Sequence, residues 1–305
     1  MFLSFDGTDK VGKDTLIAAF HKATGYQYSA INRWSGTSYA YAKFWKRDLD
    51  FKSYLLQDLE IMNSGLLIYL EASDAVIARR FFETAEKDIP LDRLQELKAY
   101  YEEYLAKTPL FYVRINTDKP IEDCVSQIQA AIELFEHESI VDKVKRLQKA
   151  ILAFGDDVSG TKELRNIKLE FTDNTEFKGL KSYIHDNNLL LHSEWPEYQV
   201  ISANIRNIIR LKLDYFKSQD IYSRQFVHHS DSCISFVQIL LRNNVLEMIV
   251  HMRSCNAVKN LLMDLYALNQ IWQVVHSYYA RQSAYKMTIY ISSAHIFTDE
   301  NGNPK

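Results

Sequence analysis

The sequence contains few cysteines: three among 305 residues, at Cys124, Cys233 and Cys255. They are too few and too far apart for a disulfide framework or a four-ligand zinc site. We therefore expect a protein of a reducing compartment.

Long apolar runs are also missing. No stretch approaches the roughly 18 apolar residues that a membrane-spanning helix needs, and the first residues enter an expected strand without a charged-then-apolar leader. We expect a cytoplasmic protein with no membrane partner.

An excess of positive charge is absent as well. The net charge is -3 and the sequence pI is about 6.3, which argues against bulk binding to duplex DNA or to an anionic membrane. A small nucleotide fits this charge better than direct nucleic-acid binding. Hydrophobic residues, by contrast, make up 47% of the chain, and its length suits two globular domains of about 150 residues.

The segment Gly7–Thr15 has the spacing G-x-x-x-x-G-K-x-T of a phosphate-binding loop. A buried strand is expected over residues 2–5 and an apolar helix from Leu16 onward, so the glycines fall in a strand-to-helix turn. Backbone N–H groups and the positive end of the helix hold phosphates in such a turn. The loop therefore predicts a nucleotide ligand.

Residues of this loop have expected roles. Lys13 is expected to reach the outer phosphates of ATP and to act in catalysis, and Thr15 to hold Mg²⁺. Asp14 occupies the variable position before Thr15 and leaves the pattern intact. The expected ATP-binding residues of the loop are Gly7, Asp9, Gly12, Lys13, Asp14 and Thr15.

The rest of the first half alternates between strands and helices. Buried strands are expected over 66–70 and 111–115, and helices over 92–105 and 121–135. This alternation implies a parallel sheet. We expect an α/β domain over residues 1–138.

This domain resembles the thymidylate kinases and related deoxynucleoside monophosphate kinases. The loop is similar, and the segment 32–41 is similar to the Asp-Arg segment that handles the acceptor monophosphate in that family. The resemblance makes Arg33 a catalytic residue. Asn32 departs from the family, which carries Asp at this position.

Three further residues have roles implied by the same resemblance. Asp9 would touch the acceptor sugar hydroxyl, and Arg79 and Arg80, in a segment that resembles the one preceding the lid of the family, would bind ATP and clamp the transferring phosphates. The alternative for the two arginines is that they lie on the surface of a helix.

The second half has more antiparallel character, because two of its expected strands join through a hairpin turn at Asn243-Asn244. We expect a domain over residues 141–305. Its expected strands are 167–171, 234–241, 245–252 and 286–292, and its expected helices are 141–154, 201–216 and 257–279.

Three blocks of this half are similar, in order and spacing, to the active-site segments of thymidylate synthases and deoxycytidylate hydroxymethylases. The blocks are Ser232–Gln238, Arg253–Asn256 and Ala294–Phe297. The resemblance implies a shortened α+β domain of that family. Cys255 and His251 have no role in the pattern, and we expect both in the core.

The resemblance also implies roles. A cysteine thiolate adds to C6 of a pyrimidine and makes C5 nucleophilic toward a one-carbon unit, and an adjacent arginine favours the thiolate and holds the nucleotide phosphate. Cys233 and Arg253 would fill these two roles. Ser254 would bind phosphate, His295 the deoxyribose hydroxyl, and Arg224 would be lent across a homodimer interface.

Asp264 lies at the position that reads the base in this family. An amide at this position suits uracil, whereas a carboxylate accepts from the exocyclic amine of cytosine. Asp264 therefore favours dCMP, with dUMP as the alternative substrate. The family also uses a glutamate near the base; we assign this role to Glu170, with Glu194 as the alternative because residues 167–171 are also typical of a strand.

Together the two halves predict a bifunctional, phage-encoded enzyme that would work in the cytoplasm of the host. It would modify C5 of dCMP with 5,10-methylene-tetrahydrofolate and phosphorylate a deoxynucleoside monophosphate with ATP and Mg²⁺. Two alternatives stay open, namely a thymidylate synthase acting on dUMP and a non-catalytic nucleotide-binding scaffold or regulator.

Overall fold

The computed structural model of the protein describes most of the chain. Glu194, Arg224 and, apart from Asn207, the expected helix over 201–216 lie outside the described residues. The chain divides into two compact units, Met1–His137 (unit 1) and Glu138–Lys305 (unit 2). The described residues are 1–48, 50–83, 89–172, 174–187, 189, 207, 227–229, 233–243, 245–279, 284–299 and 301–304.

Unit 1 is built on a parallel sheet with the strand order β2-β1-β3-β4. These strands are β1 (Phe2–Asp6), β2 (Ser29–Asn32), β3 (Gly65–Glu71) and β4 (Phe111–Asn116). The sheet confirms the expected α/β architecture. It contains the three strands expected from the sequence and adds β2 at one edge.

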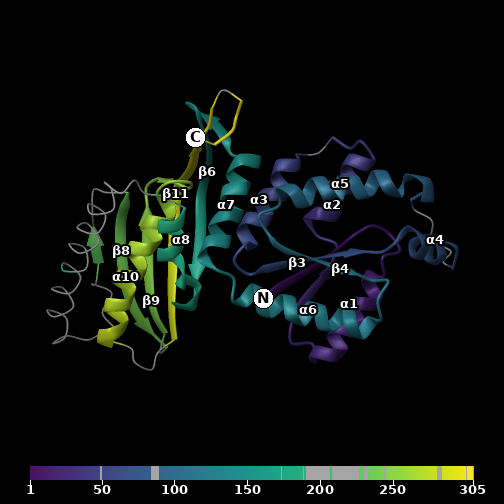
Figure 1. The fold of residues 1–305 in the computed structure, drawn as a ribbon, viewed down its shortest axis with the longest axis horizontal. Coiled ribbons are helices and arrows are strands. Elements are labelled where there is room, and N and C mark those ends of the chain that lie inside the picture. The colour runs from purple at the N-terminus through teal and green to yellow at the C-terminus, as the bar shows by residue number, and fades with distance from the viewer. Residues whose placement is uncertain are drawn as a thin grey trace. The chain divides into compact units, whose positions relative to one another are not determined.

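Helices cover both faces of this sheet. Helices α1 (Lys13–Thr24) and α6 (Ile121–Glu136) lie on one side, and α2 (Ser35–Phe44), α3 (Phe51–Ile61) and α5 (Leu94–Lys107) lie on the other (Figure 1). The remaining described helical elements are α4 (Asp74–Glu83) and the short 3-10 helix η1 (Leu91–Arg93).

Strand β3 lies in the interior of unit 1. Its residues from Gly65 to Leu70 are all buried, which explains why they form a continuous apolar run. In an open α/β sheet, ligands bind beyond the carboxyl ends of the parallel strands. The loops that follow β1, β2 and β4 meet at that edge and supply the candidate site.

The described part of unit 2 contains a mixed sheet with the order β5-β6-β11-β9-β8-β7, and β10 pairs with β11. The long strand β11 pairs with β9 in parallel and with β6 in antiparallel orientation. The strands are β5 (Asp156–Val158), β6 (Thr161–Phe171), β7 (Val227–His229), β8 (Ile234–Arg242), β9 (Val245–Met252), β10 (Cys255–Asn256) and β11 (Ala284–Phe297).

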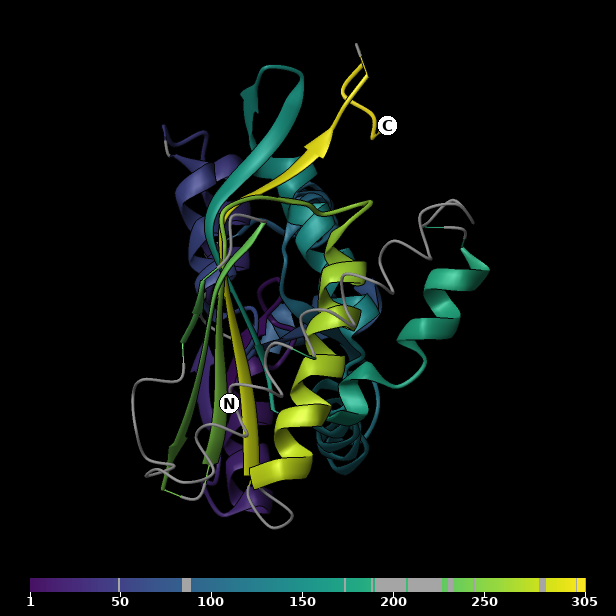
Figure 2. The same cartoon turned by 90° about the vertical axis from the view of Figure 1, so that its left-hand side faces the viewer.

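Two long helices pack on one face of this sheet. Helix α7 (Ile140–Phe154) contacts β6 and β11, and α10 (Leu261–Tyr279), which runs along the sheet in Figure 2, contacts β9. Unit 2 also contains η2 (Asn174–Phe177) and α8 (Leu180–Asp186). Among the described residues of the whole chain, no helix is long and apolar enough to span a bilayer.

The opposite face of the unit 2 sheet carries a row of aromatic rings. His229, Phe236, His251 and Tyr290 are paired across β7, β8, β9 and β11, with successive ring centroids 5.3, 5.3 and 5.0 Å apart. The expectation that His251 is a core residue is wrong. Its side chain is exposed because residues alternate along β9, and the neighbouring Met252 faces the core.

Candidate functional site

The loop between β1 and α1 has the backbone of a phosphate-binding loop. Gly7 has φ +143°, and a Cβ added there would lie 2.4 Å from the carbonyl oxygen of Leu70. Gly12 has φ +89° and precedes the first residue of α1. Both glycines are therefore required by the backbone, one by close approach to β3 and both by positive φ.

Lys13 is buried in the centre of this loop, with 7% of its surface exposed. Its Nζ donates to the carbonyl oxygens of Gly7 and Thr8, both at 2.8 Å. Burial lowers the pKa of Lys13 to about 8, although the carboxylate of Asp9 opposes this. The loop thus holds a cationic amine that can exchange backbone oxygens for phosphate oxygens.

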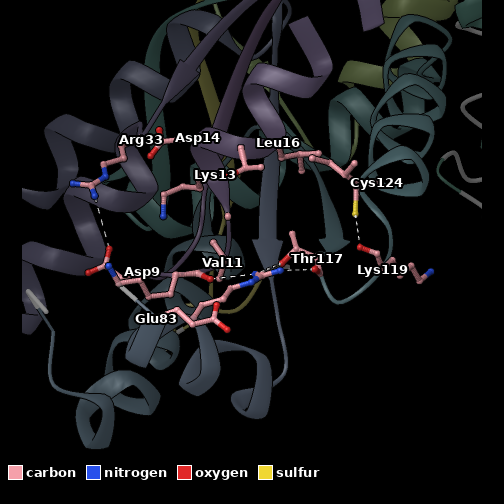
Figure 3. Close-up of a pocket in the computed structure, with 15 residues that line it drawn as sticks. Asp9, Val11, Lys13, Asp14, Leu16, Arg33, Glu83, Thr117, Lys119 and Cys124 are labelled. Carbon is pink, nitrogen blue, oxygen red and sulfur yellow. Dashed lines mark hydrogen bonds and ion pairs between the residues drawn. The ribbon is translucent and has the colours of Figure 1, made fainter. Parts of the chain in front are cut away.

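A cavity of about 510 Å³ opens over this lysine (Figure 3). Lys13, Arg33 and Arg80 line the end beside the loop between β1 and α1, and Thr117 and Cys124 line the end formed by the connection between β4 and α6. Its volume lies in the range of small-molecule and cofactor sites. Three cations from three elements therefore converge on a cavity large enough for a nucleotide.

The structure separates the two expected lid arginines. The guanidinium of Arg80 donates to the carbonyl oxygen of Lys10 at 3.1 Å and to that of Thr117 at 2.8 Å, so it joins the phosphate-binding loop to the β4–α6 connection. Arg79 instead lies 3.9 Å from Glu83 in an exposed ion pair. Arg80 lines the cavity, whereas Arg79 does not.

Arg33 lies at the end of β2 on the other side of the cavity. Its φ of +73° is rare for a residue with a side chain, and its guanidinium lies 3.8 Å from the carboxylate of Asp9. Asp9 also accepts from the hydroxyl of Tyr41 at 2.6 Å. The structure therefore brings Asp9, Arg33 and Tyr41 together on this side of the cavity.

Two buried carboxylates hold the backbone around Arg33. The amide of Trp34 donates to Asp6 at 3.0 Å, and the indole of Trp34 donates to Asp58 at 3.1 Å. The hydroxyl of Ser35 also donates to Asp58, at 2.6 Å. A strained backbone persists where its surroundings over-determine it. These bonds hold the two residues that follow Arg33, and the amide of Arg33 itself donates to the carbonyl oxygen of Phe5 at 3.0 Å.

Asp58 is fully buried and also joins α3 to α5. Its second oxygen accepts from the hydroxyls of Tyr104 and Thr108, both at 2.8 Å. Burial raises the pKa of Asp58 to about 6, against the lowering effect of these donors. No sequence pattern predicts this role, because the partners of Asp58 are 23 to 50 positions away along the chain.

The candidate residues of unit 2 gather at one end of its sheet. The amide of Arg253 donates to the carbonyl oxygen of Cys233 at 2.9 Å, and Cys233 is exposed. In the pairing of β10 with β11, Asn256 is opposite His295. Ser254 lies between Arg253 and β10 in the chain. The three blocks that resemble the active-site segments therefore lie next to one another, because Arg253 contacts Cys233 and Asn256 pairs with His295.

Asp264 reaches the same end of the sheet from the first turn of α10. It is buried, with 9% of its surface exposed, and the thiol of Cys255 donates to it at 3.6 Å. Burial and this carboxylate raise the pKa of Cys255. Cys255 is a core residue, as expected, but its thiol also contacts the carboxylate expected to read the base.

Glu170 does not join this group. It pairs with Thr288 of β11, whereas Glu163 pairs with His295, so Glu170 lies seven residues farther along β6, or about 23 Å. Burial alone would raise its pKa, but ion pairs with Lys286 and Lys168 lower it. The described residues thus give Glu170 a structural ion-pair role away from Cys233.

The solved structures compared with this chain have low sequence identity to it. No family model and no curated protein sequence matches the chain. Among solved structures, the YorR protein of Bacillus subtilis in complex with phosphorylated GDP is 18% identical, with a TM-score of 0.41, over 45% of this chain and 99% of its own. Thymidylate synthase from phage T4 is 17% identical, with a TM-score of 0.34, over 50% of this chain and 76% of its own. At these identities and TM-scores, neither likeness assigns a function to this chain.

Proposed function

We propose that unit 1 binds ATP and transfers its outer phosphoryl group to a deoxynucleoside monophosphate. The observation that carries this proposal is the buried amine of Lys13, held on two loop carbonyls at the floor of the cavity. Phosphoryl transfer requires positioning and charge neutralisation more than covalent chemistry by the protein. Lys13, Arg33 and Arg80 supply that charge from three directions.

The two ends of the cavity suit different parts of the reactants. The loop amides and Lys13 would hold the donor phosphates, and the β4–α6 connection beside Arg80 would receive the donor base. Arg33, beside Asp9 and Tyr41, would hold the acceptor monophosphate. Oxygen donors at the start of α1 suit Mg²⁺, which when bound would neutralise charge on the donor phosphates.

A direct assay tests this proposal. The protein is incubated with ATP and Mg²⁺ and with each deoxynucleoside monophosphate in turn, and the products are separated by ion-exchange chromatography. We expect ADP and the matching diphosphate in equal amounts with at least one pyrimidine acceptor. If no acceptor yields a diphosphate at high protein concentration, unit 1 is not a kinase and the scaffold alternative gains support.

We propose a second activity for unit 2, namely nucleophilic attack by Cys233 on C6 of a pyrimidine deoxynucleotide, leading to one-carbon transfer at C5. It is supported by the backbone hydrogen bond that joins Arg253 to Cys233 and by the position of Asp264 at the same end of the sheet. The thiolate forms a bond to C6 and C5 takes a proton; loss of the original C5 hydrogen to water and departure of the thiolate complete an exchange.

The one-carbon donor implied by the resemblance is 5,10-methylene-tetrahydrofolate. The described residues of unit 2 do not form a recognisable folate site, so the proposed steps concern the nucleotide alone. We further propose a homodimer through unit 2, to which Arg224 would contribute. The aromatic row from His229 to Tyr290 on the outer sheet face supports this interface.

Asp264→Asn is expected to shift the preference of unit 2 from dCMP toward dUMP. The carboxylate accepts from the exocyclic amine of cytosine, whereas an amide can also donate to the carbonyl of uracil. We expect the ratio of C5 hydrogen exchange from dCMP and dUMP to change about tenfold or more. Tritium release from C5-labelled nucleotides measures it.

Asp186→Asn is the matched control, since it makes the same change at an exposed carboxylate of unit 2. The amide at position 264 keeps an oxygen that can accept from Cys255, which protects the local fold. An unchanged ratio in the Asp264→Asn protein would exclude a base-reading role for this residue.

A further inference from the structure

Two positions of the phosphate-binding site depart from the usual pattern, and the departures are complementary. In the loop pattern, the residue directly after the lysine is Ser or Thr, whose hydroxyl ligates Mg²⁺. In this chain that residue is Asp14, and the threonine follows one position later, so the expectation that Asp14 leaves the loop pattern intact is wrong. The second departure is Asn32, which replaces the aspartate of the kinases that unit 1 resembles.

The structure brings these two residues into contact. Asn32 Nδ2 donates a hydrogen bond to Asp14 Oδ1 across 18 positions of sequence, because β2 pairs with β1 in a register that sets Asn32 beside Phe5. Asp14 lies in the first turn of α1 and lines the cavity next to Lys13 (Figure 3). The Oδ1 atom of Asn32 is buried and has no hydrogen-bond partner among the described residues.

We propose that Asp14 is the protein ligand of the divalent cation that accompanies the bound nucleotide, and that Asn32 orients it. This inference rests on the nucleotide site of the proposed function. Relative to the usual pattern, the loop carries a carboxylate in place of a hydroxyl, and the strand end carries an amide in place of a carboxylate. The site keeps one carboxylate, and hard cations such as Mg²⁺ prefer oxygen ligands of this kind. The proposed ligand of Mg²⁺ is therefore Asp14, in place of the Thr15 expected from the sequence.

Electrostatics links the two replacements. An aspartate at position 32 beside Asp14 would place two carboxylates in hydrogen-bond contact, where like charges repel. A threonine at position 14 beside Asn32 would leave the pair without a carboxylate. Asp14→Thr together with Asn32→Asp would restore the usual arrangement, with a hydroxyl on the loop and a carboxylate at the strand end.

The test measures binding of ADP by isothermal titration calorimetry, with Mg²⁺ and with a chelator, so that it does not depend on turnover. We expect Mg²⁺ to tighten binding to the unaltered protein. In Asp14→Thr this tightening should fall about tenfold or more, while ADP binding measured in the presence of the chelator is retained. The double variant Asp14→Thr, Asn32→Asp should recover the tightening to within about threefold of the unaltered protein.

A second readout and a control make the test specific. Mn²⁺ in place of Mg²⁺ reports its coordination by electron paramagnetic resonance, and the spectrum of the ADP complex should change in Asp14→Thr and return in the double variant. Asp92→Thr makes the same change at an exposed carboxylate of unit 1 that does not line the cavity, and it should leave both readouts unchanged. Thermal melts of each variant confirm that it folds, and Asn32→Asp alone should weaken ADP binding in the chelator.

The outcomes separate the inference from the function on which it rests. If Mg²⁺ tightens ADP binding but Asp14→Thr does not reduce the effect, or Asp92→Thr reduces it equally, Asp14 is not the ligand. A double variant no better than Asp14→Thr also overturns the inference. If the unaltered protein binds no ADP in either condition, the nucleotide site itself is wrong and the inference fails with it.

Discussion

Lys13→Ala is expected to reduce ATP-dependent phosphorylation by unit 1 about a hundredfold or more. The amine is buried under the loop and held by the carbonyl oxygens of Gly7 and Thr8, so it is already positioned for phosphate oxygens. Removal of one well-placed charge-stabilising group typically costs about a hundredfold to a thousandfold in turnover. Initial rates of ADP formation at saturating acceptor measure the loss.

Lys22→Ala is the matched control for this variant. Lys22 lies on the same helix and is exposed, so its removal changes the net charge equally without touching the cavity. Lys13→Ala should also keep the C5 hydrogen exchange of unit 2, because Lys13 belongs to a separate compact unit, and a thermal melt shows whether unit 1 is folded. Phosphorylation that stays within a few-fold of the unaltered rate would remove the observation on which the kinase proposal depends.

The elements that the sequence predicts are those whose pattern is set by local burial. Strand β3 was expected because it is apolar without interruption, and helices α6 and α7 because their apolar residues recur on one face. Strand β2 was missed. It is a four-residue edge strand in which exposed and half-buried residues alternate, so its apolar signal is weak.

The same distinction between local pattern and long-range packing applies to the residues of the candidate site. The phosphate-binding loop is one contiguous segment, and its spacing alone predicts its shape and Lys13 as its central cation. The choice between Arg79 and Arg80 is different, because adjacent residues on a helix point about 100° apart and only the packing of α4 decides which one reaches the loop. Sequence could not make that choice.

The other residues whose places the sequence does not predict depend on contacts between distant segments. Asp58 acts on Arg33 through Trp34 and Ser35, and these contacts exist only after α2 and α3 have packed together. Glu170 shows the opposite error: its segment can be aligned with a functional block, but the register of β6 with β11 carries it away from His295. Register depends on pairing across the sheet, which a motif does not contain.

Cys233→Ser is expected to reduce C5 hydrogen exchange from dCMP about a thousandfold or more. The proposed reaction begins with a bond between sulfur and C6, and a serine hydroxyl at the same place is a far weaker nucleophile near neutral pH. Because Cys233 is exposed, the substitution leaves no cavity in the core, and the loss should be chemical. Tritium release from C5-labelled dCMP measures the exchange without requiring a one-carbon donor.

Cys255→Ser distinguishes nucleophilic attack from disturbance of the sheet end. Cys255 is buried and donates to Asp264, and a serine hydroxyl can make the same donation, so exchange should stay within about tenfold of the unaltered protein. Phosphorylation by unit 1 should persist in both variants, because Lys13 belongs to a separate compact unit. Equal exchange by Cys233→Ser and the unaltered protein would mean that unit 2 does not use this thiol. Loss in Cys255→Ser alone would instead assign the thiol chemistry to the buried cysteine beside Asp264.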